Sequence, residues 1–145
     1  MQQKLVILGA GESGIGAALL GKQQGYEVFV SDGGTIRDIY KQELAVNHIP
    51  FEEGEHSWDV ILGADEIVKS PGIPEKSDLM KKVREKQVPV ISEIELAYRF
   101  SKDKKIIAIT GSNGKSTTTA LTYHIFKTAG LNAAMVGNIG ISYAR

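Results

Sequence analysis

Short runs of β-branched and other apolar residues alternate along the chain with longer stretches in which apolar residues recur at helical spacing. The runs that this pattern predicts as strands are residues 4–8, 27–31, 66–69, 88–91 and 105–109. Alternation of strands and helices is typical of a parallel sheet covered by helices. The chain is therefore predicted to be an α/β protein with a doubly wound, Rossmann-like parallel sheet.

Helices are predicted between these runs from the positions of apolar side chains. Leu121, Ile125 and Ala129, for example, fall on one stripe of a helix. Gly25 and Gly130 follow the first and last long helical stretches, and glycine commonly ends a helix because it adopts left-handed dihedral angles without strain. We expect a helix to end at each of these two glycines.

The sequence turns polar at Ser101-Lys-Asp-Lys-Lys105, after which a new apolar run and a new glycine-rich loop begin. We place a domain boundary there, with one domain at residues 1–101 and the start of a second at residues 102–145. The second stretch is shorter than a typical domain of roughly 100 residues. We therefore expect the second domain to be truncated, with only a strand-loop-helix-strand piece present.

Charge and cysteine content exclude several functional classes. The chain has 17 Lys and Arg against 17 Asp and Glu, so no overall basic field attracts nucleic acid or an anionic membrane. The absence of cysteine excludes disulfides, zinc-thiolate sites and a cysteine nucleophile. The first apolar run ends at Gly9, too early for a secretory signal, and no segment approaches the roughly 20 apolar residues of a membrane span. We predict a cytoplasmic protein.

The first glycine-rich loop, Gly9-Ala-Gly11-Glu-Ser-Gly14, follows the first predicted strand and opens a helix, and Asp32 closes the second strand. Gly9 permits a tight turn, Gly11 lets the backbone approach a phosphate, and Gly14 lets the helix pack closely. Asp32 is expected to accept hydrogen bonds from a nucleoside. Glycines that only serve the turn are the competing interpretation. The motif favours a nucleotide, NAD or FAD by itself, and leaves its identity open.

The second loop, Thr110-Gly-Ser-Asn-Gly-Lys-Ser-Thr117, is the stronger signal for a nucleotide triphosphate. A Gly-Lys-Ser triplet between a strand and a helix surrounds phosphates with backbone amides, places the Lys115 ammonium on the β and γ oxygens and presents the Ser116 hydroxyl to Mg²⁺. The loop is shorter than the standard phosphate-binding loop, because the nearest glycine upstream of Gly114 is Gly111. We predict that this loop binds ATP with Mg²⁺.

This shortened loop resembles the ATP loop of the Mur ligase family. Two further segments strengthen the resemblance, Ser70-Pro-Gly-Ile73 and Gly137-Asn-Ile-Gly140, together with Ser92-Glu-Ile-Glu-Leu96. The similarity covers the whole chain and is greatest to the family members that add D-glutamate to UDP-N-acetylmuramoyl-L-alanine. It implies an ATP-dependent, amide-bond-forming ligase of peptidoglycan precursor synthesis.

The resemblance also implies which residues hold the ligands. The residues that it assigns to the UDP-linked substrate are Glu12, Ser13 and Gly14 for the diphosphate, Asp32 and Gly33 for uracil, Ser70, Pro71 and Gly72 in the same cleft, and Asn138 from the second domain. Relatives commonly carry a hydroxyl or a basic side chain at the position of Gly33, so uracil recognition here is expected to use backbone groups. The residues that it assigns to ATP are Gly111, Ser112, Asn113, Gly114, Lys115, Ser116 and Thr117, with Lys115 and Ser116 as catalytic groups and Ser116 as a Mg²⁺ ligand.

Family members transfer phosphate from ATP to the alanyl carboxylate, and the amine of D-glutamate then attacks the acyl phosphate. The family's acidic Mg²⁺ ligands, modified lysine and glutamate-binding third domain have no counterpart among these residues, so the chain by itself is expected to be inactive. A full-length ligase is expected to be monomeric, whereas apolar surface on the truncated piece favours self-association of this fragment.

Three alternatives remain open. One is an NAD(P)-dependent oxidoreductase, which would explain Gly9, Gly11, Gly14 and Asp32. A regulatory nucleotide sensor would use the fold without chemistry, and another Mur ligase would add a different amino acid. Glu93 and Glu95 are interpreted as part of a helix-capping box that begins at Ser92. His48, His56 and His124 are dispersed, so local structural roles are favoured over metal binding, and Trp58 is expected to pack.

Overall fold

A computed structural model describes residues 2–101, 104–139 and 141–145 of the chain. Its centre is a five-stranded parallel sheet with the order β3-β2-β1-β4-β5. The strands are β1 at Lys4–Leu8, β2 at Glu27–Asp32, β3 at Phe51–Glu53, β4 at Glu66–Lys69 and β5 at Val90–Ile91. The chain runs outward from β1 to β3, returns, and runs outward again from β4 to β5. This confirms the predicted doubly wound α/β fold.

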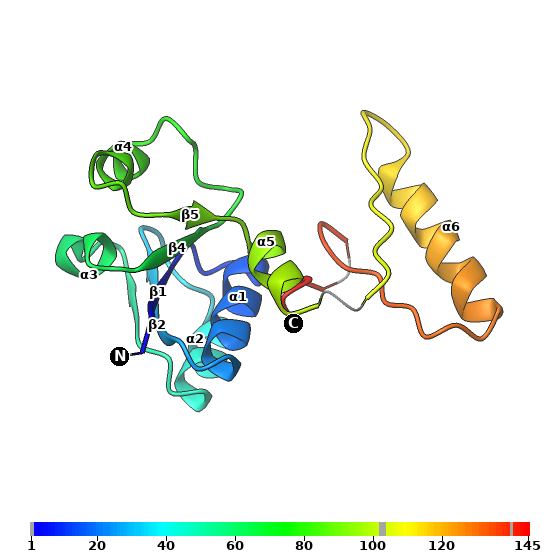
Figure 1. The fold of residues 1–145 in the computed structure, drawn as a ribbon, viewed down its shortest axis with the longest axis horizontal. Coiled ribbons are helices and arrows are strands. Elements are labelled where there is room, and N and C mark those ends of the chain that lie inside the picture. The colour runs from blue at the N-terminus through cyan, green and yellow to red at the C-terminus, as the bar shows by residue number, and fades with distance from the viewer. Residues whose placement is uncertain (1, 102–103, 140) are drawn as a thin grey trace.

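Helices cover both faces of the sheet (Figure 1). One face carries α1 at Glu12–Gln23, α2 at Asp38–Val46 and α5 at Glu93–Arg99, which pack together over the strands. The other face carries α3 at Trp58–Leu62 and α4 at Asp78–Glu85. The long helix α6 at Lys115–Thr128 stands apart from the sheet.

The central strand β1 explains why both faces must be covered. Leu5 and Ile7 lie in the core beneath α1, whereas Val6 and Leu8 lie in the core beneath α3 and α4, and all four are almost fully buried. Successive side chains of a strand point to opposite faces, so a strand with four successive apolar residues needs a helix layer on each side. Each buried side chain of this size contributes about 2 kcal/mol by removal from water.

The two predicted strands of the second domain are not formed, which corrects that part of the fold prediction. Residues 105–109 have no assigned strand, and the stretch before Gly137 forms only an isolated bridge between Val136 and Ile141. A strand needs a neighbouring strand for its backbone hydrogen bonds, and within the described ranges none lies beside residues 105–109. Ile106 and Ile107 consequently remain about half exposed, at 47% and 51%.

The sheet contains one strand that the pattern missed and one that is shorter than expected. β3 has three residues, two of them glutamates, which is too short and too polar for an alternating pattern. β5 begins only at Val90, because Pro89 has no amide hydrogen and takes part in the sheet only as an acceptor from Ile67 N. The edge strands of the sheet are thus the ones least visible in the sequence.

The predicted helix ends are confirmed. Gly25 and Gly130 follow α1 and α6 with φ of +85° and +75°, and each donates its amide to a carbonyl of the preceding turn. The Ser92 hydroxyl accepts a hydrogen bond from Glu95 N at 3.1 Å, which confirms the helix cap. The first two residues of the proposed second domain, 102 and 103, lie outside the described residues, as does Gly140 of the segment Gly137-Asn-Ile-Gly140. In the part of the chain that is described, no helix has the length and apolar character needed to cross a membrane.

Candidate functional site

A cleft opens where the sheet reverses its winding direction, at the carboxyl ends of β1 and β4. There Gly9, in the loop after β1, donates its amide to Ser31 O of β2 at 2.9 Å. Ser70, which follows β4, donates its amide to Leu8 O at the end of β1 at 2.9 Å. The cleft has a volume of about 400 Å³. Its lining residues are Gly9, Gly11, Asp32, Gly33, His56, Ser70, Gly72, Ile73, Ser77 and Leu79. Parallel sheets of this type bind ligands at this position.

The three glycines of the first loop differ in what surrounds them. Gly9 has φ of +92°, and a Cβ there would lie 2.7 Å from the Cβ of Ser70. A Cβ on Gly14 would lie 1.9 Å from the carbonyl oxygen of Gly9. Gly11 has an ordinary extended conformation and nothing within 4 Å of its Cβ position. The loop therefore needs Gly9 and Gly14 to form, while Gly11 leaves its outer surface open at the beginning of α1.

Asp32 holds the cleft together. One carboxylate oxygen accepts a hydrogen bond from Ala10 N at 2.7 Å, and the other accepts from Gly34 N at 2.8 Å. The side chain thus joins the loop after β1 to the turn after β2. A carboxylate offers about four acceptor positions, so these two bonds leave capacity for a ligand. The expected contact between Asp32 and a nucleoside stays a prediction.

A hydrogen-bonded network behind the cleft was not foreseen from the sequence. The Ser31 hydroxyl lies 2.6 Å from a carboxylate oxygen of Glu52 and 2.7 Å from Nδ1 of His56. Ser57 donates to Glu52 from both its amide and its hydroxyl. Burial alone would raise the pKa of Glu52, but the hydrogen bonds from Ser31 and Ser57 outweigh it and hold that pKa below its usual value. Glu52 belongs to the missed strand β3, so no sequence signal linked His56 to the glycine loop.

Four of the residues assigned to the UDP-linked substrate line this cleft, namely Asp32, Gly33, Ser70 and Gly72. The other five do not line it: Glu12, Ser13 and Gly14 form the first turn of α1 behind Gly11, Pro71 lies between Ser70 and Gly72, and Asn138 follows Gly137 near the C-terminal end of the chain. These assignments stay predictions.

Glu12 is engaged by the end of the chain. Its carboxylate accepts hydrogen bonds from Arg145 Nε at 2.8 Å, from Tyr40 at 3.3 Å and from Ser142 N at 3.3 Å. Burial acts to raise the pKa of Glu12, yet these bonds prevail and lower it. Arg145 also pairs with Glu43 on α2. The Glu12 carboxylate, which is predicted to lie at a substrate diphosphate, is therefore already paired with the Arg145 guanidinium.

Glu93 joins the same C-terminal segment to α5. Its buried carboxylate accepts hydrogen bonds from the Ser142 hydroxyl and from Ala144 N, both at 2.7 Å. Gly16 on α1 makes room for this contact, because a Cβ there would lie 2.2 Å from the Ser142 hydroxyl oxygen. Gly137 N in turn donates to Ile141 O at 2.9 Å. The segment that carries Asn138 is thus connected to the first domain through Glu93. Glu93 also belongs to the first turn of α5, which Ser92 caps.

Replacing Glu93 with alanine is expected to release residues 141–145 from α5. The change removes the acceptor of the Ser142 hydroxyl and the shorter of the two hydrogen bonds of the Ala144 amide, which keeps only a 3.2 Å contact with Ser142 Oγ. A buried unsatisfied donor costs about 1–3 kcal/mol. Hydrogen exchange at the Ala144 amide should accelerate about tenfold or more. Glu95→Ala is the matched control, because the Glu95 carboxylate pairs with Arg99 on the surface and its substitution leaves the backbone bond to Ser92 in place. Unchanged exchange at Ala144 in the Glu93 variant would contradict this role.

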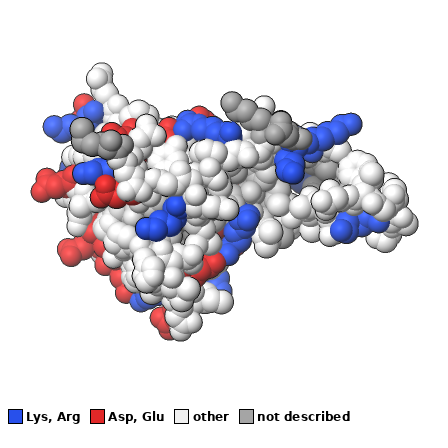
Figure 2. Space-filling model, turned by 60° about the horizontal axis from the view of Figure 1, so that its bottom comes forward, with Lys and Arg blue, Asp and Glu red and all other residues white. Residues whose placement is uncertain are grey.

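The second loop places its functional groups at the beginning of α6. Gly114 has φ of +75° at the N-cap, and Lys115 is the first residue of the helix. The Lys115 ammonium turns back over the loop, donating to the carbonyls of Gly111 and Ser112. Residues 104–145 contain lysines and one arginine but no aspartate or glutamate. Figure 2 shows the same imbalance as blue without red on the visible face of the end that carries α6.

Ser116 can contribute one hydroxyl oxygen to a magnesium ion. Among the described residues no group of three or more His, Cys, Asp or Glu could hold a metal. Mg²⁺ usually keeps several waters and is bound by one or two carboxylates together with substrate phosphates. The loop therefore fits a single contact to a magnesium ion that arrives with the nucleotide, and it offers no complete metal site.

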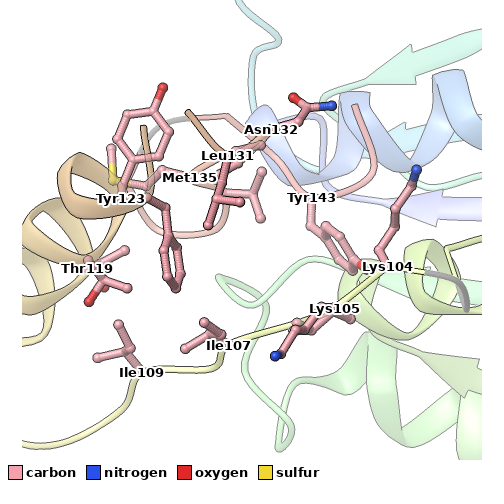
Figure 3. A pocket seen from close by; sticks show the side chains of 16 residues that line it. Lys104, Lys105, Ile107, Ile109, Thr119, Tyr123, Leu131, Asn132, Met135 and Tyr143 are labelled. Carbon is pink, nitrogen blue, oxygen red and sulfur yellow. The ribbon is translucent and has the colours of Figure 1, made fainter. Parts of the chain in front are cut away.

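A larger cavity of about 600 Å³ lies between α6 and the segments on either side of it. Figure 3 shows Ile107, Ile109, Leu131 and Met135 pointing into it, and no residue of the loop 110–117 lines it. α6 has no buried residue, and Leu121 remains 58% exposed. The cavity is mainly apolar and therefore does not suit phosphate groups, and ATP binding by the loop 110–117 stays a prediction. The predicted self-association through this surface stays a prediction.

Comparison with known proteins gives a consistent result. Residues 3–92 match the family model described as Mur ligase MurD-like, N-terminal domain. The chain is 57% identical over 142 residues to the UDP-N-acetylmuramoylalanine--D-glutamate ligase of Bacteroides thetaiotaomicron, covering 98% of this chain and 32% of that protein. It is 57% identical over 146 residues to the ligase of the same name from Cytophaga hutchinsonii, covering 100% and 32%.

A solved structure with a related fold is that of UDP-N-acetylmuramate-alanine ligase MurC from Thermotoga maritima. Its TM-score is 0.60 at 25% identity, covering 89% of this chain and 30% of that protein. The chain spans about 32% of the length of the curated relatives that it matches.

Proposed function

The chain belongs to the Mur ligases and matches their MurD-like N-terminal domain, and from this premise we propose that it is part of an ATP-dependent ligase. The ligase joins D-glutamate to UDP-N-acetylmuramoyl-L-alanine in peptidoglycan precursor synthesis, and it acts in the cytoplasm. The choice of D-glutamate is supported by relatives at 57% identity that are named UDP-N-acetylmuramoylalanine--D-glutamate ligase.

The observation that carries the proposal is a pair of glycine loops, each at the N-terminus of a helix. The first opens α1 beside the cleft at the winding reversal, and the second opens α6 with Lys115 over the loop. Helix N-termini bind phosphates through free amide groups and the helix dipole. One loop suits a substrate diphosphate and the other a triphosphate, which is the pair of ligands that the proposed reaction needs.

The proposed reaction has two steps. A carboxylate oxygen of the alanyl group attacks the terminal phosphorus of ATP, forming an acyl phosphate as ADP leaves. The D-glutamate amine then attacks the acyl carbon, and an amide forms as inorganic phosphate leaves and the amine loses a proton. A free carboxylate is a poor electrophile, so the phosphoryl group is needed to activate it.

The residues of this chain contribute positioning and charge neutralisation to those steps. Lys115 and the amides at the beginning of α6 stabilise negative charge on the transferred phosphoryl group. The Ser116 hydroxyl would hold a magnesium ion that arrives with the nucleotide, and that ion would supply charge neutralisation at the phosphates. The cleft at β1 and β4 holds the UDP part, and Asn138 meets the substrate from the loop that Glu93 ties to α5. No nucleophilic side chain is required.

Calorimetric titration separates this proposal from an NAD(P)-dependent oxidoreductase. The chain is titrated with UDP-N-acetylmuramoyl-L-alanine and, separately, with NADH. We expect binding of the UDP ligand with no comparable response to NADH, because both carboxylate oxygens of Asp32 accept hydrogen bonds from backbone amides, of Ala10 and Gly34, and are less available for the ribose hydroxyls of a dinucleotide. Tight binding of NADH without a response to the UDP ligand would overturn the proposal.

A further inference from the structure

His56 occupies one wall of the cleft with its ring in a fixed orientation. Nδ1 lies 2.7 Å from the Ser31 hydroxyl at the back, and the opposite nitrogen Nε2 lies 3.0 Å from the Cβ position of Gly33 at the mouth. The ring meets Trp58 edge to face, with 6.2 Å between centroids. In the described part of the chain no hydrogen bond involves Nε2. The histidine therefore presents one ring nitrogen to whatever occupies the cleft.

The hydrogen bonds at the back of the cleft determine which ring nitrogen carries the proton. Glu52 is ionised at neutral pH and can only accept, so the Ser31 hydroxyl must donate its single proton to it across 2.6 Å. Ser31 is completely buried, and its oxygen is then left as an acceptor. The 2.7 Å contact with His56 consequently requires a hydrogen on Nδ1. In the neutral ring, Nε2 carries no hydrogen and is an acceptor.

Gly33 keeps this acceptor accessible. A side chain at position 33 would begin 3.0 Å from Nε2 and 3.6 Å from Cε1 of the same ring. Glycine leaves that space to a ligand. The cleft thus has one oriented hydrogen-bond acceptor that the protein itself does not use, next to the turn at which the nucleoside is expected.

We propose that His56 is a specificity-determining residue, whose Nε2 accepts a hydrogen bond from the imide N3–H of uracil. This inference rests on the proposed function and extends it to the base. Uracil has a donor at N3, whereas cytosine has an acceptor there, so cytosine would place two lone pairs against each other. Leaving a buried polar group unpaired is what allows a site to reject a close analogue strongly.

The test is the affinity of the chain for UDP and for 3-methyl-UDP, which lacks the N3 hydrogen, with CDP as a third ligand. The expected result is that wild-type protein prefers UDP over both analogues by about tenfold or more. His56→Ala removes the acceptor and makes room for the methyl group, so the preference for UDP over 3-methyl-UDP should disappear. His124→Ala is the matched control, because His124 is exposed on α6, and it should keep the wild-type preference.

Gly33→Ala provides a second route to the same answer if His56→Ala does not fold. Its methyl group covers Nε2 without removing the Ser31 bond, so UDP affinity should fall about tenfold. Binding of UDP with equal affinity for 3-methyl-UDP in the wild type, or an unchanged preference in His56→Ala, would overturn the role of His56 and leave the proposed function standing. Absence of binding to both UDP and UDP-N-acetylmuramoyl-L-alanine would instead refute the proposed function.

Discussion

Replacing Gly14 with alanine is expected to destabilise the sheet domain by about 3 kcal/mol or more. The added Cβ would lie 1.9 Å from the carbonyl oxygen of Gly9 and 3.0 Å from its carbonyl carbon, and both are backbone atoms. Gly9 cannot move away easily, because its amide is bonded to Ser31 O and its own Cβ position is already against Ser70. Urea unfolding followed by circular dichroism measures the loss as a lower midpoint.

Gly11→Ala is the matched control, three residues away in the same loop. Nothing lies within 4 Å of its Cβ position and its φ is −78°, so alanine fits and stability should change by less than about 1 kcal/mol. Affinity for the UDP ligand should nevertheless fall, because the methyl group stands between the loop backbone and a phosphate. Equal stability of Gly14→Ala and the wild type would show that the loop does not have the conformation described above.

Replacing Lys115 with alanine is expected to lower kcat of the full-length ligase about 100-fold or more. The ammonium lies over the loop and is placed to neutralise charge that develops on the transferred phosphoryl group. Steady-state release of ADP in the presence of UDP-N-acetylmuramoyl-L-alanine and D-glutamate measures the effect. Thermal unfolding should change little, because the hydrogen bonds of Lys115 are exposed and local.

Lys127→Ala controls for the loss of a positive charge on the same helix. Lys127 lies in the last turn of α6 and is exposed, far along the helix from the loop. It should retain nearly full activity. If Lys115→Ala uses ATP at the wild-type rate, the assignment of the loop 110–117 to ATP is wrong.

The central strands could be predicted from the sequence because their apolar residues are adjacent in the chain. The pattern predicts β1 and β4 at the residues where they occur, since each contains successive buried apolar residues, four in β1 and two in β4, that the two faces of the sheet cover. Residues 105–109 have the same kind of pattern and form no strand. Apolar periodicity reports what a segment can bury, whereas a strand also needs a partner for its backbone groups.

The glycine loop was also visible in the sequence, because it acts over a short distance, whereas Asp32 was identified only from its place at the end of the second strand. Gly9 and Gly14 shape a single turn, and Asp32 bonds to that turn from the end of the neighbouring strand. His56 gave no such signal and was interpreted as a local structural residue. Its position depends on Ser31 and Glu52, which belong to two different strands.

By itself, then, the sequence determined the doubly wound sheet and the two loops at helix N-termini. These depend on periodicity and on backbone conformations that only glycine adopts, and both are properties of neighbouring residues. The tertiary structure decided the rest: the use of Asp32 as a clamp, the open acceptor on His56, and the tie between Glu93 and the residues that follow Asn138. Each of these features depends on a hydrogen bond between segments far apart in the chain. The packing of the strands and helices determines which groups meet in that bond.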